Sequence, residues 1–160
     1  MFPSLDVLDG MYNEPITGVA FSPDNIFLLT YGGYHAQIWR INTKSVMTTI
    51  SHEKGITVAK FNPQSSSVAT AAADGSIKIW QDEREVANMV GHTKKIHALE
   101  FSPDGALIFT GSDDKLGMLW GATAVEGTCN YRLEHSVAGH SKGVRSVAFG
   151  GAREEAAVQS

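Results

Sequence analysis

Two groups of side chains that could perform hydrolysis recur along the chain at an offset of forty residues. Each group contains a histidine, a threonine and an aspartate: His52, Thr70 and Asp74, then His92, Thr110 and Asp114. A hydroxyl beside a histidine and a carboxylate is the arrangement that activates a nucleophile in hydrolases. The duplication favours another interpretation, because a catalytic group is not normally copied into each structural unit, whereas a structural bond is. We therefore predict that both groups are structural, and a hydrolase built on the second group is the alternative.

The other chemistry-bearing residues do not form a metal or cofactor site. The histidines are scattered and Cys129 is the single cysteine, so no ligand set with the spacing of a zinc site is available. Asp113 and Asp114 lack the alternating acidic spacing of a calcium loop. The segment Gly91–Lys95 lacks the second glycine of a phosphate-binding loop. We expect neither a metal ion nor a cofactor.

The elements that must position the two groups follow from a repeat of about forty residues. The repeated aromatic residues are Phe21, Phe61 and Phe101, each before a proline-containing turn, and Trp39, Trp80 and Trp120. Proline presets φ and glycine accepts a positive φ, so each of these turns ends one strand and begins another. Evenly spaced short strands joined by turn signals, with no sustained helical period, predict an all-β fold.

This repeat resembles the WD-repeat family of β-propellers, from about Leu5 to Phe149. The shared features are the unit length, the glycine–histidine pair at Gly91–His92 and the tryptophan that closes the third strand. The resemblance implies a partial propeller of four-stranded antiparallel blades. We expect a WD-repeat region at 1–149 and a C-terminal tail at 150–160 that is disordered. The expected blades are 11–50, 51–90 and 91–138, with a partial blade at 139–149.

The resemblance also implies a role for the two groups. In that family a histidine before the first strand, a serine or threonine in the second, an aspartate in the turn and the tryptophan form a hydrogen-bonded tetrad. The implied tetrads are His52, Thr70, Asp74 and Trp80, and His92, Thr110, Asp114 and Trp120. The first unit departs from the pattern, with Met11 and Tyr12 in place of glycine and histidine and no aspartate in its turn. We expect it to be the least rigid.

Three blades and a fraction cannot close a propeller, which needs at least about four. After Phe149 the expected turn sequence gives way to Gly150–Glu155. An open array exposes apolar faces and strand edges. We therefore expect a piece of a larger propeller, or completion by association into a homo-oligomer. A truncated product without independent function is an alternative.

Candidate partner-binding residues fall at one rim of the expected propeller. They are Tyr31, Tyr34, His35, Lys54, Lys94, Lys95, Asp113, Lys115 and Lys142. The lysines recur in equivalent loops, so they favour an acidic peptide or a phosphate. The third unit is eight residues longer around Gly121–Asn130, at the opposite rim. Trp80–Arg84 approaches a signature that docks some WD-repeat proteins onto ubiquitin ligases, which makes a substrate adaptor a further alternative.

The composition of the chain bears on its partners and its cellular compartment. Thirteen Lys and Arg against seventeen Asp and Glu give a net charge of −4, which disfavours nucleic-acid binding by bulk charge. The sequence shows no apolar run long enough to cross a membrane and no secretory signal, and with one cysteine it fits the cytoplasm or nucleus. We predict a noncatalytic scaffold that binds protein or peptide partners within a larger complex; a regulatory part of an enzyme is another alternative.

Overall fold

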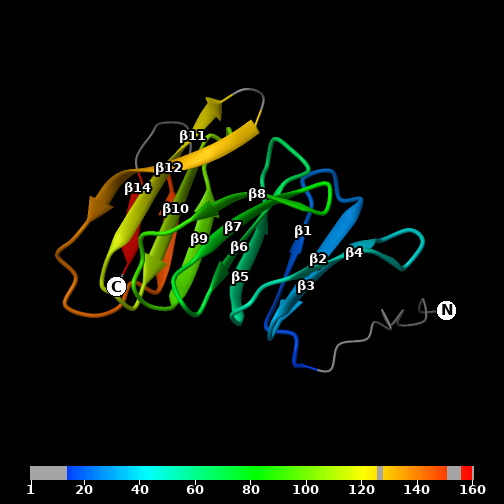
Figure 1. The fold of residues 1–160 in the computed structure, drawn as a ribbon, viewed down its shortest axis with the longest axis horizontal. Helices are drawn as coiled ribbons and strands as arrows, with labels where there is room; N and C mark the ends of the chain where they lie inside the picture. Colours follow the sequence, from blue (N-terminus) through cyan, green and yellow to red (C-terminus); the bar gives the residue numbers. More distant parts are fainter. Residues whose placement is uncertain (1–13, 126–127, 151–155, 160) are drawn as a thin grey trace.

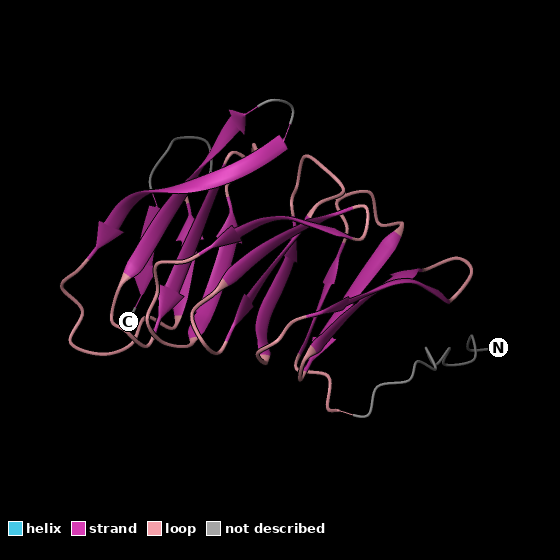
Figure 2. Cartoon of the chain, in the orientation of Figure 1, coloured by secondary structure: helices cyan, strands magenta, loops and turns pink. Residues whose placement is uncertain are grey.

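The computed structural model describes residues 14–125, 128–150 and 156–159, and every regular element within them is a β-strand (Figure 2). The strands are β1 Gly18–Phe21, β2 Phe27–Gly32, β3 His35–Arg40, β4 Ser45–Ser51, β5 Ile56–Phe61, β6 Val68–Ala72, β7 Ile77–Gln81, β8 Arg84–Met89, β9 Ile96–Phe101, β10 Leu107–Ser112, β11 Gly117–Val125, β12 Thr128–Val137, β13 Ser146–Phe149 and β14 Ala156–Gln159. The all-β prediction is confirmed. The described residues include no helix that could span a membrane.

Consecutive strands pair antiparallel into three four-stranded sheets (Figure 1). The first sheet is β1–β4, the second is β5–β8 and the third is β9–β12, each in chain order. This is the blade architecture that the forty-residue repeat predicts. The expected outer strand at about Leu5–Leu8 and the atypical pair Met11 and Tyr12 lie outside the described residues.

The turn between the first two strands of a sheet forms as its sequence predicts. In the third sheet the Ser102 hydroxyl donates to Asp104, and the Asp104 carboxylate accepts the Ala106 backbone N–H at 3.0 Å. Gly105 follows at φ +71°, a conformation that side chains with a Cβ rarely adopt. The local chemistry thus reverses the chain and sends β10 back along β9.

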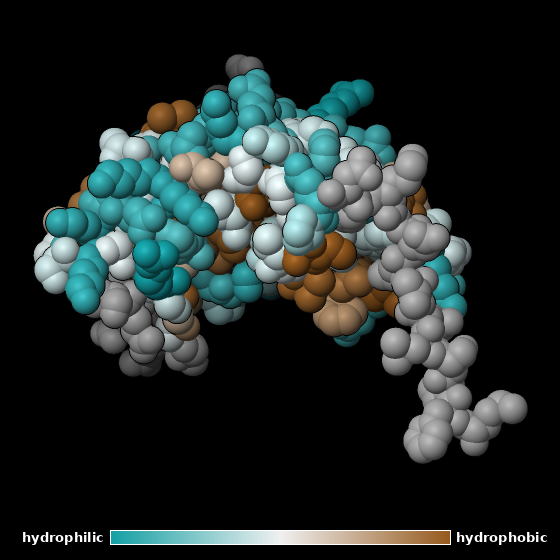
Figure 3. Space-filling view, turned by 90° about the horizontal axis from the view of Figure 1, so that it is seen from below, coloured by the Kyte–Doolittle hydropathy of each residue, from teal (hydrophilic) through white to brown (hydrophobic). Residues whose placement is uncertain are grey.

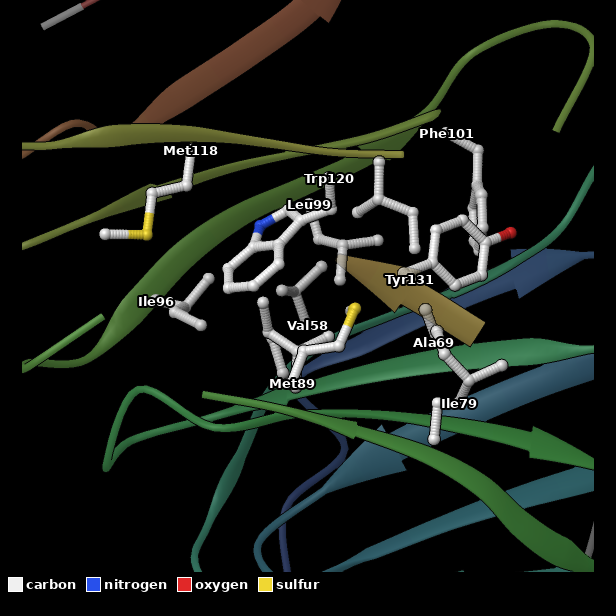
Figure 4. Packing of buried hydrophobic residues seen from close by; sticks show 14 residues of the cluster. Val58, Ala69, Ile79, Met89, Ile96, Leu99, Phe101, Met118, Trp120 and Tyr131 are labelled. Carbon is white, nitrogen blue, oxygen red and sulfur yellow. The ribbon is translucent and has the colours of Figure 1, made fainter. Parts of the chain in front are cut away.

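The sheets pack face to face, and the seams between them hold the core. The largest apolar cluster joins the second and third sheets and includes Ile79, Leu99 and Trp120 (Figure 4). A second cluster joins the first and second sheets, and a third joins the third sheet to β13 through Phe109 and Val147. Each blade therefore depends on its neighbour for burial, as expected of a repeat array.

The array is an open arc, with hydrophobic surface exposed in its concavity (Figure 3). Val19 and Phe21 on β1 are 59% and 62% exposed, whereas their equivalents on β9, Leu99 and Phe101, are 2% and 7% exposed. The difference arises because no described sheet lies before the first one. The predicted exposure of an apolar face is therefore present at this end of the array.

The structure adds detail to the third unit and to the tail. Within the tail at 150–160, for which we expected disorder, Ala156–Gln159 forms β14 and pairs antiparallel with β13. Pairing satisfies backbone groups along the β13 edge that would otherwise face solvent. The extra residues around Gly121–Asn130 lengthen β11 and β12 into a long hairpin, so they extend the sheet as well as a loop.

Candidate functional site: buried tetrads and a loop edge

In the third sheet four side chains from separate segments form one chain of hydrogen bonds. Trp120 Nε1 donates to Thr110 Oγ1 at 3.0 Å, and Thr110 Oγ1 lies 2.8 Å from His92 Nε2. His92 Nδ1 lies 2.8 Å from Asp114 Oδ2. The loop before β9 is thereby tied to β10, to the turn after β10 and to β11.

The protonation of this chain follows from burial. Burial lowers the pKa of His92, although the nearby Asp114 opposes the shift. The neutral imidazole then donates through Nδ1 to Asp114 and accepts the Thr110 hydroxyl at Nε2. Asp114 is completed by the backbone N–H groups of Thr93 and Leu116, at 3.0 Å each. Burial acts to raise the pKa of Asp114, but its hydrogen bonds outweigh burial and lower it.

In the second sheet the same four residue types do not form a complete chain of hydrogen bonds. Trp80 Nε1 donates to Thr70 Oγ1 at 2.9 Å, as in the third sheet. His52 is buried, and its Nε2 has no hydrogen-bond partner among the described residues. Its Nδ1 accepts the Lys54 backbone N–H at 3.4 Å, so the imidazole bonds within its own loop.

A serine next to the turn accounts for the missing bond between Asp74 and His52. Asp74 Oδ1 accepts the Ser76 hydroxyl at 2.6 Å and the Ser76 backbone N–H at 3.0 Å. The residue at the equivalent place in the third sheet is Leu116, which has no hydroxyl. A serine two residues after an aspartate competes for the carboxylate through a local turn. Asp74 is thus engaged beside its own turn. Burial lowers the pKa of His52, with Lys78 adding to the effect.

The first sheet contains part of the same bond, which the sequence analysis missed. Trp39 Nε1 donates to Thr30 Oγ1 at 2.9 Å. The signal was available, because Thr30 stands forty residues before Thr70. The threonine–tryptophan pair is therefore common to all three sheets, whereas the link to histidine and aspartate occurs only in the third among the described residues.

The buried groups are poorly placed for hydrolysis. Thr110 is fully buried and His92 is 4% exposed, so a substrate carbonyl has no path to the hydroxyl. The described residues also contain no group of three or more His, Cys, Asp or Glu side chains placed to hold a metal ion. The arrangement positions loops and strands relative to one another.

The predicted lysines do share one edge of the array. Lys54 lies in the loop between the first two sheets, Lys94 and Lys95 in the next loop, and Lys142 in the loop before β13; all four are exposed. This edge faces the viewer in Figure 3, where hydrophilic surface covers the third-sheet side. We name this edge, defined by the four exposed lysines, the lysine edge.

Asp113 is engaged by neighbours at this edge. His97 Nε2 lies 2.8 Å from Asp113 Oδ2, and Arg145 Nη2 lies 3.2 Å from Asp113 Oδ1. The hydrogen bond to His97 lowers the pKa of Asp113, with further lowering by nearby positive charge. Sequence reasoning missed His97 and Arg145, because no spacing rule links them. Lys115 is exposed at the same turn, at φ +74°.

The three aromatic candidates of the first sheet do not form one cluster. The Tyr31 ring lies against Gly18 so closely that a Cβ there would collide with it. Tyr34 is 51% exposed, and its backbone N–H donates to Glu14 at 2.9 Å. His35 is exposed, with Nδ1 lying 3.1 Å from the Ser51 hydroxyl. Tyr34 and His35 are accessible, whereas Tyr31 mainly packs within the seam.

Comparisons with known proteins agree with this architecture. The family model described as WD domain, G-beta repeat matches residues 43–81 and 83–121. COMPASS component SWD3 of Saccharomyces cerevisiae is 31% identical over 134 residues, which cover 82% of this chain and 41% of that protein. A chromatin assembly factor 1 subunit FAS2 homolog of Oryza sativa is 28% identical and covers 85% of this chain and 30% of its own length.

Two further matches extend the comparison. Target of rapamycin complex subunit wat1 of Schizosaccharomyces pombe is 28% identical, covering 76% of this chain and 39% of that protein. The solved structure of U3-55K superposes with a TM-score of 0.77 at 16% identity, covering 89% of this chain and 44% of its own. The chain thus spans less than half the length of each of these four proteins.

Proposed function

The chain belongs to the WD-repeat family, and from that premise we propose that it is a noncatalytic scaffold that binds protein partners within a larger complex. Three relatives bear names that make them a component or a subunit of a complex. The proposed setting is the nucleus or the cytoplasm, supported by a relative named for chromatin assembly.

The proposal rests on one contrast: the groups that could catalyse a reaction are buried, whereas the charged groups that could bind a partner are exposed. The hydroxyl, imidazole and carboxylate of the third sheet bond one another inside the fold. The charged side chains of the connecting loops lie outside, on the lysine edge. Function on exposed loops held by a rigid scaffold is the usual arrangement in such folds.

The lysine edge is the surface that we assign to an acidic peptide. Its four lysines come from three successive loops, so a bound chain can run along the arc and meet several charges. Exposed charges act mainly by steering and are weakened by salt. Binding by this edge is therefore expected to weaken as salt rises.

Fluorescence anisotropy with a labelled glutamate-rich peptide tests this assignment. A Lys54→Glu/Lys94→Glu variant should weaken binding at least tenfold. The matched control is Arg84→Glu/Arg132→Glu, which makes the same charge change on residues away from this edge and should alter binding less than twofold. Equal effects of the two variants would refute the assignment to the lysine edge.

A second partner surface is proposed at the free face of the first sheet. Val19 and Phe21 are exposed there although their third-sheet equivalents are buried. The proposed occupant is another blade-like sheet, from further blades or from a second copy of the chain. Light scattering tests the second-copy form: a mass at an integer multiple above 17.2 kDa supports it, and a monomer refutes it.

A further inference from the structure

The two seams between the sheets differ at one edge of the array. The first seam, between the first and second sheets, holds a cavity of about 420 Å³. Its apolar lining is formed by Phe27, Ile38, Met47, Phe61 and Pro63. It opens among the β1–β2, β5–β6 and β7–β8 turns, at the edge opposite the lysine edge (Figure 1). This volume lies within the range of ligand pockets.

The mouth of the cavity is acidic. Asp24, Asp82 and Glu83 line it, and no lysine or arginine among the described residues does. The hydrogen bond from the Ser22 hydroxyl lowers the pKa of Asp24, aided by the Ile26 backbone N–H, so this carboxylate stays ionised near neutral pH. An apolar hollow bordered by carboxylates favours an apolar group that carries positive charge beside it.

In the second seam, between the second and third sheets, a tyrosine fills the equivalent place (Figure 4). Tyr131 on β12 packs edge-on against Phe101, with ring centroids 6.5 Å apart. Its hydroxyl donates to the Gly105 carbonyl at 2.9 Å and accepts from Asn62 Nδ2 at 3.3 Å. The ring is buried and joins the main core cluster.

The repeat makes the two places comparable residue by residue. Phe61 in the first seam stands where Phe101 stands in the second, and Ser65 stands where Gly105 does. Tyr131 comes two residues before Leu133, the partner of Trp120 on β12. The residue two before the partner of Trp80 is Glu83, which is exposed in the tight turn between β7 and β8. The short turn therefore supplies no ring to the first seam.

From this juxtaposition we propose that the first-seam cavity binds an aromatic side chain of a partner protein, a tyrosine flanked by arginine or lysine. The ring packs against Phe61 as Tyr131 packs against Phe101. The phenol donates to the Ser65 carbonyl, as Tyr131 donates to Gly105. The flanking cations meet the carboxylates of Asp82 and Glu83 at the mouth. Tyr131, which fills the second seam from within the chain, thus indicates the kind of side chain that a partner would insert into the first seam.

NMR titration of the full chain with a capped peptide, one tyrosine between arginines, tests the proposal. The peptide should shift the backbone amide signals of Met47, Phe61 and Ser65 saturably. Its counterpart with alanine in place of tyrosine should bind at least tenfold more weakly. Equal binding of the two peptides would show that charge alone attracts them and would overturn the proposal.

Two variants distinguish a blocked cavity from a damaged fold. Met47→Trp should block the cavity and weaken binding at least tenfold, whereas Val46→Trp, on a neighbour that does not line it, should change binding less than twofold. Both residues are partly exposed, at 46% and 39%, so neither change crowds a buried core. Equal effects of these two substitutions would contradict the assignment.

A charge variant keeps the proposal testable if Met47→Trp fails to fold. Asp82→Asn/Glu83→Gln should weaken binding several-fold and reduce its salt dependence, and unchanged binding would contradict the acidic mouth. Lys54→Glu/Lys94→Glu should bind the tyrosine peptide as the wild type does, because those residues lie on the opposite edge. The proposal for the cavity can therefore be confirmed or refuted independently of the proposal for the lysine edge.

Discussion

In the third sheet Asp114 reaches His92 across the loop, whereas in the second sheet Asp74 turns back to Ser76. Both sheets carry histidine, threonine, aspartate and tryptophan at matching spacings. Spacing therefore brings the four residues into one neighbourhood, while a local competitor for the carboxylate decides whether it bonds the histidine. In the second sheet one hydroxyl two residues beyond the aspartate engages the carboxylate whose equivalent bonds the histidine in the third sheet.

The largest expected effect is at the threonines. Thr110→Val leaves His92 Nε2 and Trp120 Nε1 without their shared partner, and each unpaired buried group costs about 1–3 kcal/mol. We expect a loss of about 3 kcal/mol in the free energy of unfolding, against about 1 kcal/mol for Thr70→Val. Urea denaturation of the two variants measures the difference. Equal losses would mean that the two sheets are bonded alike in solution.

The histidines should differ in the same direction. His92→Leu deprives Asp114 and Thr110 of a buried partner and should cost about 2 kcal/mol. His52→Leu removes one nitrogen that is already unpaired and one that accepts only the Lys54 backbone N–H, so its cost should be smaller, about 1 kcal/mol. Thermal unfolding of both variants provides the check. A larger loss for His52→Leu than for His92→Leu would reverse the comparison.

Acid should weaken both sheets through these histidines. Burial lowers the pKa of His52 and of His92, so the folded state favours the neutral imidazole and the unfolded chain takes up the proton first. Stability is therefore full above about pH 6.5, the ordinary histidine value, and falls as the pH drops below it. Urea midpoints at pH 7.5 and 5.5 should show this fall, and His52→Leu should reduce it. An unchanged midpoint would contradict buried neutral imidazoles.

The smallest expected effect is at the competitor itself. Ser76→Ala removes the hydroxyl that occupies Asp74, which frees the carboxylate to turn toward His52. We expect a stability change of only a few tenths of a kcal/mol, because one hydrogen bond replaces another. The sensitive readout is the ¹⁵N chemical shifts of the His52 ring, which should move toward those of His92. Unmoved shifts would show that some other feature holds the two groups apart.

Much of the fold was predictable because the repeat acts locally. The turn residues and alternating apolar residues of each unit specify strands without reference to distant segments, and Thr70–Trp80 and Thr110–Trp120 pair as neighbours within one sheet. The hydrogen bond from Trp39 to Thr30 follows the same rule. Sequence reasoning succeeds here because hairpin geometry fixes which residues face one another.

The rest depended on contacts that no spacing rule encodes. Tyr131 enters a seam from a lengthened hairpin and meets Asn62 of the preceding sheet. Arg145 reaches Asp113 from the loop before β13. The β14 strand pairs with the edge of β13, and that edge exists only when β13 has formed. In each case, the deciding term is packing between units, which depends on how the sheets stack.

We expect the buried third-sheet tetrad to hold the fold and the exposed loops to bind partners, and two measurements on one variant test both expectations. For Thr110→Val, measured where it is fully folded, the account predicts a lower free energy of unfolding and an unchanged dissociation constant for the glutamate-rich peptide. Unchanged stability together with lost binding would contradict it, because the cluster would then belong to the functional surface.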